Sequence, residues 1–250
     1  MHVMFIPLTI LGLAAGVLVN RLGTDLPARR RISQPHCPYC GKTRPLWQWV
    51  TLPSFLIWNA RCPYCDAPIR LREPLVEVGL VVAYNYVWIA FGSSIQAFLY
   101  AVYTTIFALV IVTDIERRLI LNVVTYPAIL FGFGASFINP EMRWDYSLLG
   151  GLVGFGFFLV AMIIGERVFG SGALGMGDVK LALFIGLIVG FPLVIEMLVI
   201  TILVGAAVSS FLLLTGVCGL HDHLPYGPFL VVGALVTLFW GYHIMEWFLY

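Results

Sequence analysis

The chain has 250 residues, of which 60% are hydrophobic and only 11% are charged, and its formal net charge is +1. Soluble domains are nearer half apolar and a quarter charged. The composition therefore excludes a soluble globular protein and predicts an all-α polytopic membrane protein, for which we expect no nucleic-acid partner.

Apolar runs of about 17–25 residues can cross a bilayer as helices. The sequence predicts about eight such transmembrane helices, at residues 3–20, 75–91, 95–113, 120–138, 147–165, 179–191, 194–215 and 226–248. Phe191-Pro192 interrupts the sixth, so the sixth and seventh could instead be one broken element. The first has no basic residue ahead of it and no small-residue cleavage site, which favours a retained span over a signal peptide.

Lysine and arginine accumulate in the cytoplasmic loops of membrane proteins. Here they cluster in residues 21–74, after the third predicted span and on either side of the loop before the sixth. With eight spans these positions all lie on one side, which predicts a cytoplasmic location for them and an N-terminus outside. A basic loop at that face also suits anionic lipid headgroups.

Residues 21–74 are the one predicted soluble segment, and we call them the insert. We expect three parts: a first transmembrane helix at 1–20, the cytoplasmic insert at 21–74 and a transmembrane bundle at 75–250. Two CPYC motifs in the insert contribute Cys37, Cys40, Cys62 and Cys65, with 21 residues between the pairs. This spacing is typical of a structural Zn²⁺ site with four thiolate ligands. The alternative of redox pairs or local disulfides is disfavoured in the cytoplasm.

Two aspartates stand at predicted membrane edges. Asp114 ends the third span, and Asp178 begins the sixth within Gly175-Met176-Gly177-Asp178-Val179-Lys180. Carboxylates at such positions are costly and are therefore functional candidates. Two of them at close range do not both ionise, so one can act as an acid and the other as a base, as in aspartic proteases.

Each aspartate also has a simpler interpretation. Asp178 could cap a helix, and Asp114 could be a solvated edge residue, with Glu116 competing for its role. Lys180 could hold Asp178 ionised or extend to the headgroups. His221, Asp222 and His223 form either a polar loop or a metal site. The occurrence of both aspartates on one predicted face favours a catalytic pair.

The sequence resembles the bacterial type IV prepilin peptidases, which are membrane aspartic proteases of the GxGD type and also N-methyltransferases. The resemblance rests on the paired cysteine motifs, the Asp114 segment and three further stretches: Ile69–Glu77, Gly175–Leu181 and Leu224–Phe229. It implies that Asp114 and Asp178 are catalytic, that Gly175, Gly177 and Lys180 belong to the active-site loop, and that the four cysteines bind zinc.

The resemblance further implies a location in the bacterial inner membrane, with the active site at the cytoplasmic face. The implied substrates are the prepilins and pseudopilins of type IV pili and type II secretion. The basic leader of the substrate is cut off after a glycine, and the new N-terminus is methylated with S-adenosylmethionine. Three positions depart from the family pattern, namely Glu116, Leu121 and Arg72-Glu73-Pro74.

Methylation is expected to depend on the insert and its junction with the second span, because a charged nucleoside cofactor needs a polar site. Arg72 and Glu77 lie at this junction, and Glu77 could hold or deprotonate the new amine. Alternatively, Glu77 pairs with a neighbouring arginine. Two other functions stay open: a non-enzymatic membrane scaffold or transporter whose zinc ribbon binds a partner, and a peptidase without methyltransferase activity.

Overall fold

The structure is a computed structural model that describes residues 5–28, 34–57, 60–169, 174–217, 219 and 224–249. Within these residues it is helical, apart from turns and two isolated β-bridges. The helices are α1 (Phe5–Asp25), η2 (Leu46–Gln48), α2 (Thr51–Ile57), α3 (Arg72–Phe91), α4 (Ile95–Arg117), α5 (Asn122–Ala135), α6 (Trp144–Phe169), α7 (Met176–Val189), α8 (Leu193–Leu214) and α9 (Gly227–Leu249). The chain divides into two compact units, Met1–Thr113 and Asp114–Tyr250.

Each predicted span coincides with a helix. In the part of the chain that the structure describes, six helices are long and apolar enough to cross a membrane: α1, α3, α4, α6, α8 and α9. The other two, α5 and α7, have 14 residues each, or about 21 Å of helix at 1.5 Å per residue. Since a hydrocarbon core is about 30 Å thick, the structure supports six spans by length, and eight remains a prediction.

The sixth and seventh predicted segments are separate helices. α7 ends before Gly190, whose φ of +75° favours glycine, and α8 begins directly after Pro192. The His221–His223 cluster lies outside the described residues, so its two interpretations remain open.

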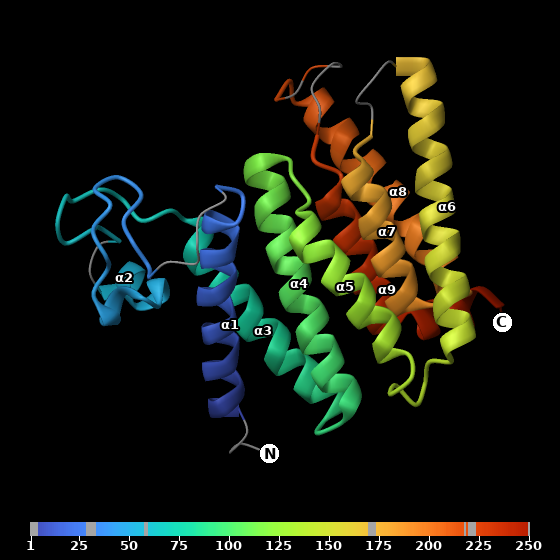
Figure 1. Cartoon of the computed structure of the whole chain (residues 1–250), viewed down its shortest axis with the longest axis horizontal. Helices are drawn as coiled ribbons and strands as arrows, with labels where there is room; N and C mark the ends of the chain where they lie inside the picture. Colours follow the sequence, from blue (N-terminus) through green and yellow to red (C-terminus); the bar gives the residue numbers. More distant parts are fainter. Residues whose placement is uncertain are drawn as a thin grey trace. The chain divides into compact units, whose positions relative to one another are not determined.

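In the first unit, α1 and α3 pack against each other in antiparallel directions (Figure 1). A Cβ on Gly12 would lie 2.8 Å from Cα of Val81, and one on Gly16 would lie 2.7 Å from Cα of Glu77. Glycines spaced by four let two helix backbones approach this closely. One turn further along, Asn20 Nδ2 donates a hydrogen bond of 2.9 Å to the carbonyl of Glu73.

In the second unit, α7 is the central helix, with α5, α6, α8 and α9 as neighbours (Figure 1). Its side chains from Asp178 to Val189 are almost all buried. α6 approaches it through small residues: a Cβ on Gly154 would lie 2.7 Å from the carbonyl oxygen of Ala182, and Ser147 donates a hydrogen bond of 2.6 Å to the carbonyl of Leu187. This enclosure fixes the position of the first turn of α7, where Asp178 lies.

Candidate functional site

Asp114 lies in the last turn of α4 and is 5% exposed. Its Oδ2 accepts a hydrogen bond of 2.9 Å from the backbone N–H of Gly227, the first residue of α9. The first N–H groups of a helix have no partner within the helix. Asp114 therefore satisfies one of these groups, and its carboxylate is held in place by α9.

Asp178 is the third residue of α7 and is 9% exposed. Its backbone N–H donates to the carbonyl of Gly175, 3.0 Å away, and its Oδ2 lies 3.3 Å from the position that a Cβ on Gly175 would take. At Gly177, a Cβ would lie only 2.9 Å from Cβ of Ile120. The two glycines thus allow the start of α7 to pack closely against Ile120 and Asp178 to bend back over Gly175.

Both aspartates lie at the same site within the second unit. The charge of Asp114 acts on Asp178, and the phenol of Tyr226 lies within electrostatic range of Asp178. Tyr226 immediately precedes Gly227, which binds Asp114. Two buried carboxylates in mutual range are the arrangement needed to share one proton between an acid and a base.

The charged residues two positions after each aspartate, Glu116 and Lys180, lie in different environments. Glu116 is exposed, in contrast to Asp114 on the same helix. Lys180 Nζ donates a hydrogen bond of 2.9 Å to Asn122 Oδ1 and lies 4.9 Å from the ring centroid of Tyr126. Both of these contacts are with α5, so Lys180 links α7 to α5.

The four insert cysteines form one cluster. Their Sγ atoms all lie within 4.8 Å of one another. The Cys37–Cys65 and Cys40–Cys62 pairs are 3.7 and 3.9 Å apart, and all four are free thiols. Tetrahedral coordination with Zn–S bonds of about 2.3 Å requires sulfurs about 3.8 Å apart. The spacing fits a metal ion and excludes disulfides in this structure.

The two cysteine motifs adopt the same local fold. In the first, the N–H of Cys37 bonds to the carbonyl of Lys42, and in the second, the N–H of Cys62 bonds to that of Ala67, both at 2.9 Å. Gly41 and Asp66 occupy the same left-handed position after each motif, with φ of +69° and +58°. Each tight turn presents two sulfurs to the cluster.

Backbone amides also act on the sulfurs. Burial of Cys62 opposes ionisation, but the N–H groups of Tyr64 and Cys65 stabilise its thiolate and lower its pKa to about 7. A thiolate is the form that binds a metal. The N–H of Ala67 stabilises the Cys65 thiolate, but burial and hydrogen bonds with the other three sulfurs outweigh it and raise the pKa of Cys65. A cation bound by all four sulfurs would therefore displace a proton from this motif.

Side chains in the first two turns of α3 bind both α1 and the insert. Arg72 donates hydrogen bonds to Thr24 Oγ1 at 2.9 Å and to the carbonyl of Asn20 at 3.3 Å, both on α1. Glu73 forms a buried two-point ion pair with Arg44, with N–O distances of 2.5 and 3.1 Å. Burial opposes the charge of Arg44, but the bonds to Glu73 outweigh it and raise the pKa of Arg44.

Glu77, fully buried, caps the start of α2. Its carboxylate oxygens accept hydrogen bonds from Thr51 N at 2.9 and 3.0 Å, Thr51 Oγ1 at 2.8 Å and Leu52 N at 2.9 Å. A carboxylate suits the positive end of a helix. Of the two sequence-based interpretations of Glu77, these contacts favour a structural pairing, although the partner is α2 rather than an arginine.

Several of these residues were not singled out from the sequence. Gly227 lies in a stretch that carries the family resemblance, but nothing local indicated that its N–H binds Asp114. Arg44 and Thr51 are ordinary polar residues of the insert, and only the fold brings them to the buried glutamates of α3.

Two family models match the chain. A model described as the bacterial peptidase A24 N-terminal domain matches residues 10–91, and one described as the type IV leader peptidase family matches residues 101–210. The first contains the four cysteines and the start of α3, and the second contains both aspartates.

Curated proteins named prepilin leader peptidase/N-methyltransferase are similar to nearly the whole chain. One from Bacillus subtilis (strain 168) is 28% identical over 244 residues, covering 97% of this chain and 96% of the relative. One from Burkholderia pseudomallei (strain 1026b) is 27% identical and covers 87% and 71%. One from Pseudomonas aeruginosa is 27% identical and covers 85% and 73%. No solved structure matches the chain.

Proposed function

Because the chain belongs to the bacterial type IV leader peptidase family, we propose that it is an aspartic endopeptidase that removes the basic leader from type IV prepilins or pseudopilins. The observation that supports this most is that buried Asp114 and Asp178 occupy one site. The six membrane-capable helices among the described residues accord with a multi-pass protein of the bacterial inner membrane.

The proposed chemistry needs only the two carboxyl groups. The ionised one takes a proton from water as the oxygen attacks the scissile carbonyl, and the protonated one gives its proton to the carbonyl oxygen. Collapse of the tetrahedral intermediate breaks the C–N bond, and the leaving amine takes up a proton. The pair titrates as a unit rather than as two separate acids. The N–H of Gly227 orients Asp114, and Gly175 and Gly177 place Asp178.

The charge distribution suggests how a substrate is presented. We propose that the basic loops and the active site face the cytoplasm and that the N-terminus lies outside. A prepilin is an apolar helix with a basic leader, so its helix would lie in the bilayer and its leader would meet the aspartates at the boundary. The basic insert would bind anionic headgroups rather than the leader.

We propose Zn²⁺ as the ion for the cluster of Cys37, Cys40, Cys62 and Cys65. Sulfur spacings of 3.7 and 3.9 Å fit tetrahedral thiolate coordination. Four protein ligands leave no position for water, so the ion would be structural. It would hold a segment too small to stabilise itself by apolar burial.

We further propose that the enzyme methylates the new N-terminus, as the names of its relatives suggest. S-adenosylmethionine would supply the methyl group. To accept the methyl group, the new amine would first have to lose a proton. Arg72 and Glu77 are proposed to support this step by holding α1 and α2 to α3.

The test is incubation of the purified protein with a candidate prepilin, with and without S-adenosylmethionine, followed by mass spectrometry. Leader loss with a methylated product supports both activities. Leader loss without methylation leaves a peptidase alone. No leader loss from any prepilin or pseudopilin would favour a membrane scaffold or transporter.

A further inference from the structure

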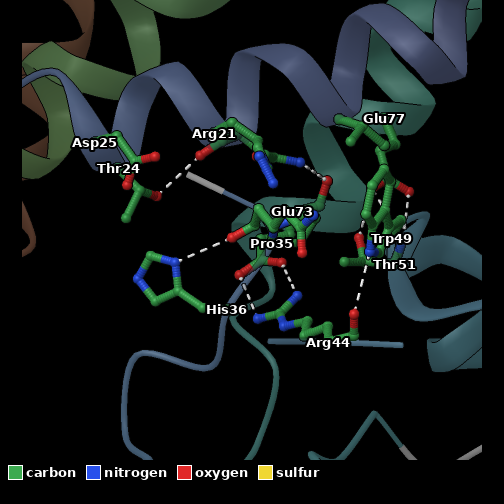
Figure 2. A pocket seen from close by; sticks show the side chains of 13 residues that line it. Arg21, Thr24, Asp25, Pro35, His36, Arg44, Trp49, Thr51, Glu73 and Glu77 are labelled. Atoms are coloured by element: carbon green, nitrogen blue, oxygen red, sulfur yellow. Dashed lines mark hydrogen bonds and ion pairs between the residues drawn. The ribbon is translucent and has the colours of Figure 1, made fainter. Parts of the chain in front are cut away.

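Arg44 follows the first cysteine motif and is buried against the start of α3. Its guanidinium donates two hydrogen bonds to the carboxylate of Glu73, and the two side chains are 8% and 11% exposed. Figure 2 shows the guanidinium and this carboxylate facing each other across the dashed bonds. Because a buried cation has lost its hydration, it is stable only where negative groups or hydrogen-bond acceptors replace the water.

The backbone of Arg44 is held as well as its side chain. Its N–H donates a hydrogen bond of 2.6 Å to the carbonyl of Pro35, and its carbonyl accepts one of 3.1 Å from Trp49 Nε1. The guanidinium of Arg21 on α1 lies 5.8 Å from the centroid of the Trp49 ring. Arg44 is therefore tied to the chain just before the first cysteine motif and, through Trp49, to α1.

The cysteine cluster supplies further negative charge to Arg44. Burial opposes the charge of Arg44, but Glu73 and the thiolates of Cys37 and Cys62 outweigh it and raise the pKa of Arg44. These two cysteines are the buried members of the cluster, so water screens their charge less than that of the exposed pair. Four thiolates around a divalent cation leave an excess of two negative charges, which a neighbouring cation stabilises.

Arg61 is nearer to a cysteine in the sequence but lies in a different environment. It immediately precedes Cys62, its side chain is 57% exposed, and its ion-pair partner Asp66 is 75% exposed. Solvent and salt screen the charge of such an exposed residue. Arg61 therefore provides a comparison for the effect of burial at Arg44.

We infer that Arg44 stabilises the metal-bound cysteine cluster and at the same time holds it to α3, so that metal binding and docking of the insert on the membrane helices are coupled. The inference rests on the proposed Zn²⁺ site and adds to it a residue outside both cysteine motifs. Such coupling is reciprocal. Bound metal strengthens the docking of the insert, and a docked insert binds the metal more tightly.

The first test measures zinc affinity rather than enzyme activity. Full-length protein in nanodiscs is loaded with Zn²⁺ and titrated with a chelator of known affinity, and the released metal is measured. We expect Arg44→Met to weaken zinc binding by about tenfold or more, as changes beside metal ligands usually do. Arg61→Met is the matched control and should stay within about twofold of wild type.

The second test measures docking by amide hydrogen exchange, with mass spectrometry of zinc-loaded and chelator-treated protein. In wild type, removal of zinc should speed exchange in residues 44–52, which include the N–H groups bound to Glu77. Exchange in residues 179–189 of α7, in the other unit, should not change. In Arg44→Met the zinc-dependent difference over 44–52 should shrink. A response to zinc confined to 36–43 and 61–68 would contradict the coupling.

Wild-type zinc affinity in folded Arg44→Met would overturn the inference, as would an equal loss in Arg61→Met. Thermal unfolding shows whether each variant is folded. If Arg44→Met unfolds because Glu73 is left buried and unpaired, the double variant Arg44→Met with Glu73→Leu replaces the ion pair by apolar side chains, a change that proteins often tolerate. The double variant should also lose zinc affinity. The exchange experiment on wild type decides without any variant.

The zinc content of wild-type protein separates this inference from the proposed metal site. If wild type and Arg44→Met hold zinc equally tightly, the site is retained and the role of Arg44 is lost. If wild type binds no zinc through its cysteines, both are lost.

Discussion

Gly227 and Asp114 are bound so closely that the hydrogen bond leaves no room for a side chain. The N–H of Gly227 lies 2.9 Å from Oδ2 of Asp114, and a Cβ on Gly227 would lie 2.6 Å from the same oxygen. Real Cβ atoms do not approach an oxygen this closely. The glycine is therefore required by the carboxylate, and not only by the start of α9.

Gly227→Ala should lower the cleavage rate by about tenfold or more, since small displacements of a catalytic group are costly. Alanine keeps the N–H, so the effect would come from its methyl group pushing Asp114 aside. A gel assay of prepilin processing measures it. Gly134→Ala on α5 is the matched control, because a Cβ there meets nothing within 4 Å. Wild-type cleavage by Gly227→Ala would show that Asp114 can move without loss.

Asp114→Asn or Asp178→Asn should lower cleavage by at least about 100-fold while the protein remains folded in membranes. An amide can neither accept the proton from water nor donate one as a carboxylic acid does. The measurement is processing of a prepilin by each purified variant. Glu116→Gln, an exposed carboxylate on the same helix, should have a much smaller effect. A loss in Glu116→Gln as large as that in Asp114→Asn would mean that Glu116 is the catalytic partner.

Removal of two cluster ligands, for example by Cys37→Ser with Cys65→Ser, should reduce the zinc content well below one equivalent per chain. Thiolates bind zinc far better than hydroxyls. Elemental analysis checks this, and Cys218→Ser, outside the two motifs, is the control. We expect methylation to fall with the zinc and cleavage to continue, because the aspartates belong to the other unit. Undiminished zinc in the double variant would place the ion elsewhere.

The fold was largely predictable because its signals are local. Apolar runs gave each long helix, and the two CPYC motifs gave the sulfur cluster, because each motif places two ligands in one turn. Helix ends were less predictable. α1 continues from residue 20 to Asp25, and α3 begins at Arg72, because polar residues in these turns find partners in the fold, such as Thr24 with Arg72.

The contacts across segments could not be predicted in the same way. Nothing near Glu77 in the sequence indicates that residues 51–52, which lie 26 and 25 positions earlier, begin a helix that needs a cap. The sequence therefore suggested a bare carboxylate for Glu77. Asn20 is a similar case, because only the fold shows that its buried Oδ1 accepts no hydrogen bond from a described residue.

Glu77→Gln should retain cleavage and raise the concentration of S-adenosylmethionine needed for half-maximal methylation. The amide of Glu77→Gln keeps one acceptor oxygen for α2, whereas the side chain of Glu77→Leu keeps none. A hydrogen bond to a charged group contributes about 1.5–3 kcal/mol to the stability of the fold. The increase in the required cofactor concentration should therefore be smaller for Glu77→Gln than for Glu77→Leu. Mass spectrometry of products over a cofactor series measures both activities. Complete loss of methylation in Glu77→Gln at saturating cofactor would instead indicate direct proton transfer by Glu77.

The bonds from Glu73 and Glu77 to the insert also constrain how the sequence can diverge. Both glutamates are buried at the start of a membrane helix, and their partners, Arg44 and the first turn of α2, come from the insert. A relative that lost the residues between α1 and α3 would keep two buried charges without partners, and breaking one buried pair costs about 3–5 kcal/mol. We therefore expect the cysteine motifs and these two acidic positions to be inherited or lost together, with neutral residues replacing the glutamates wherever the cysteines are missing.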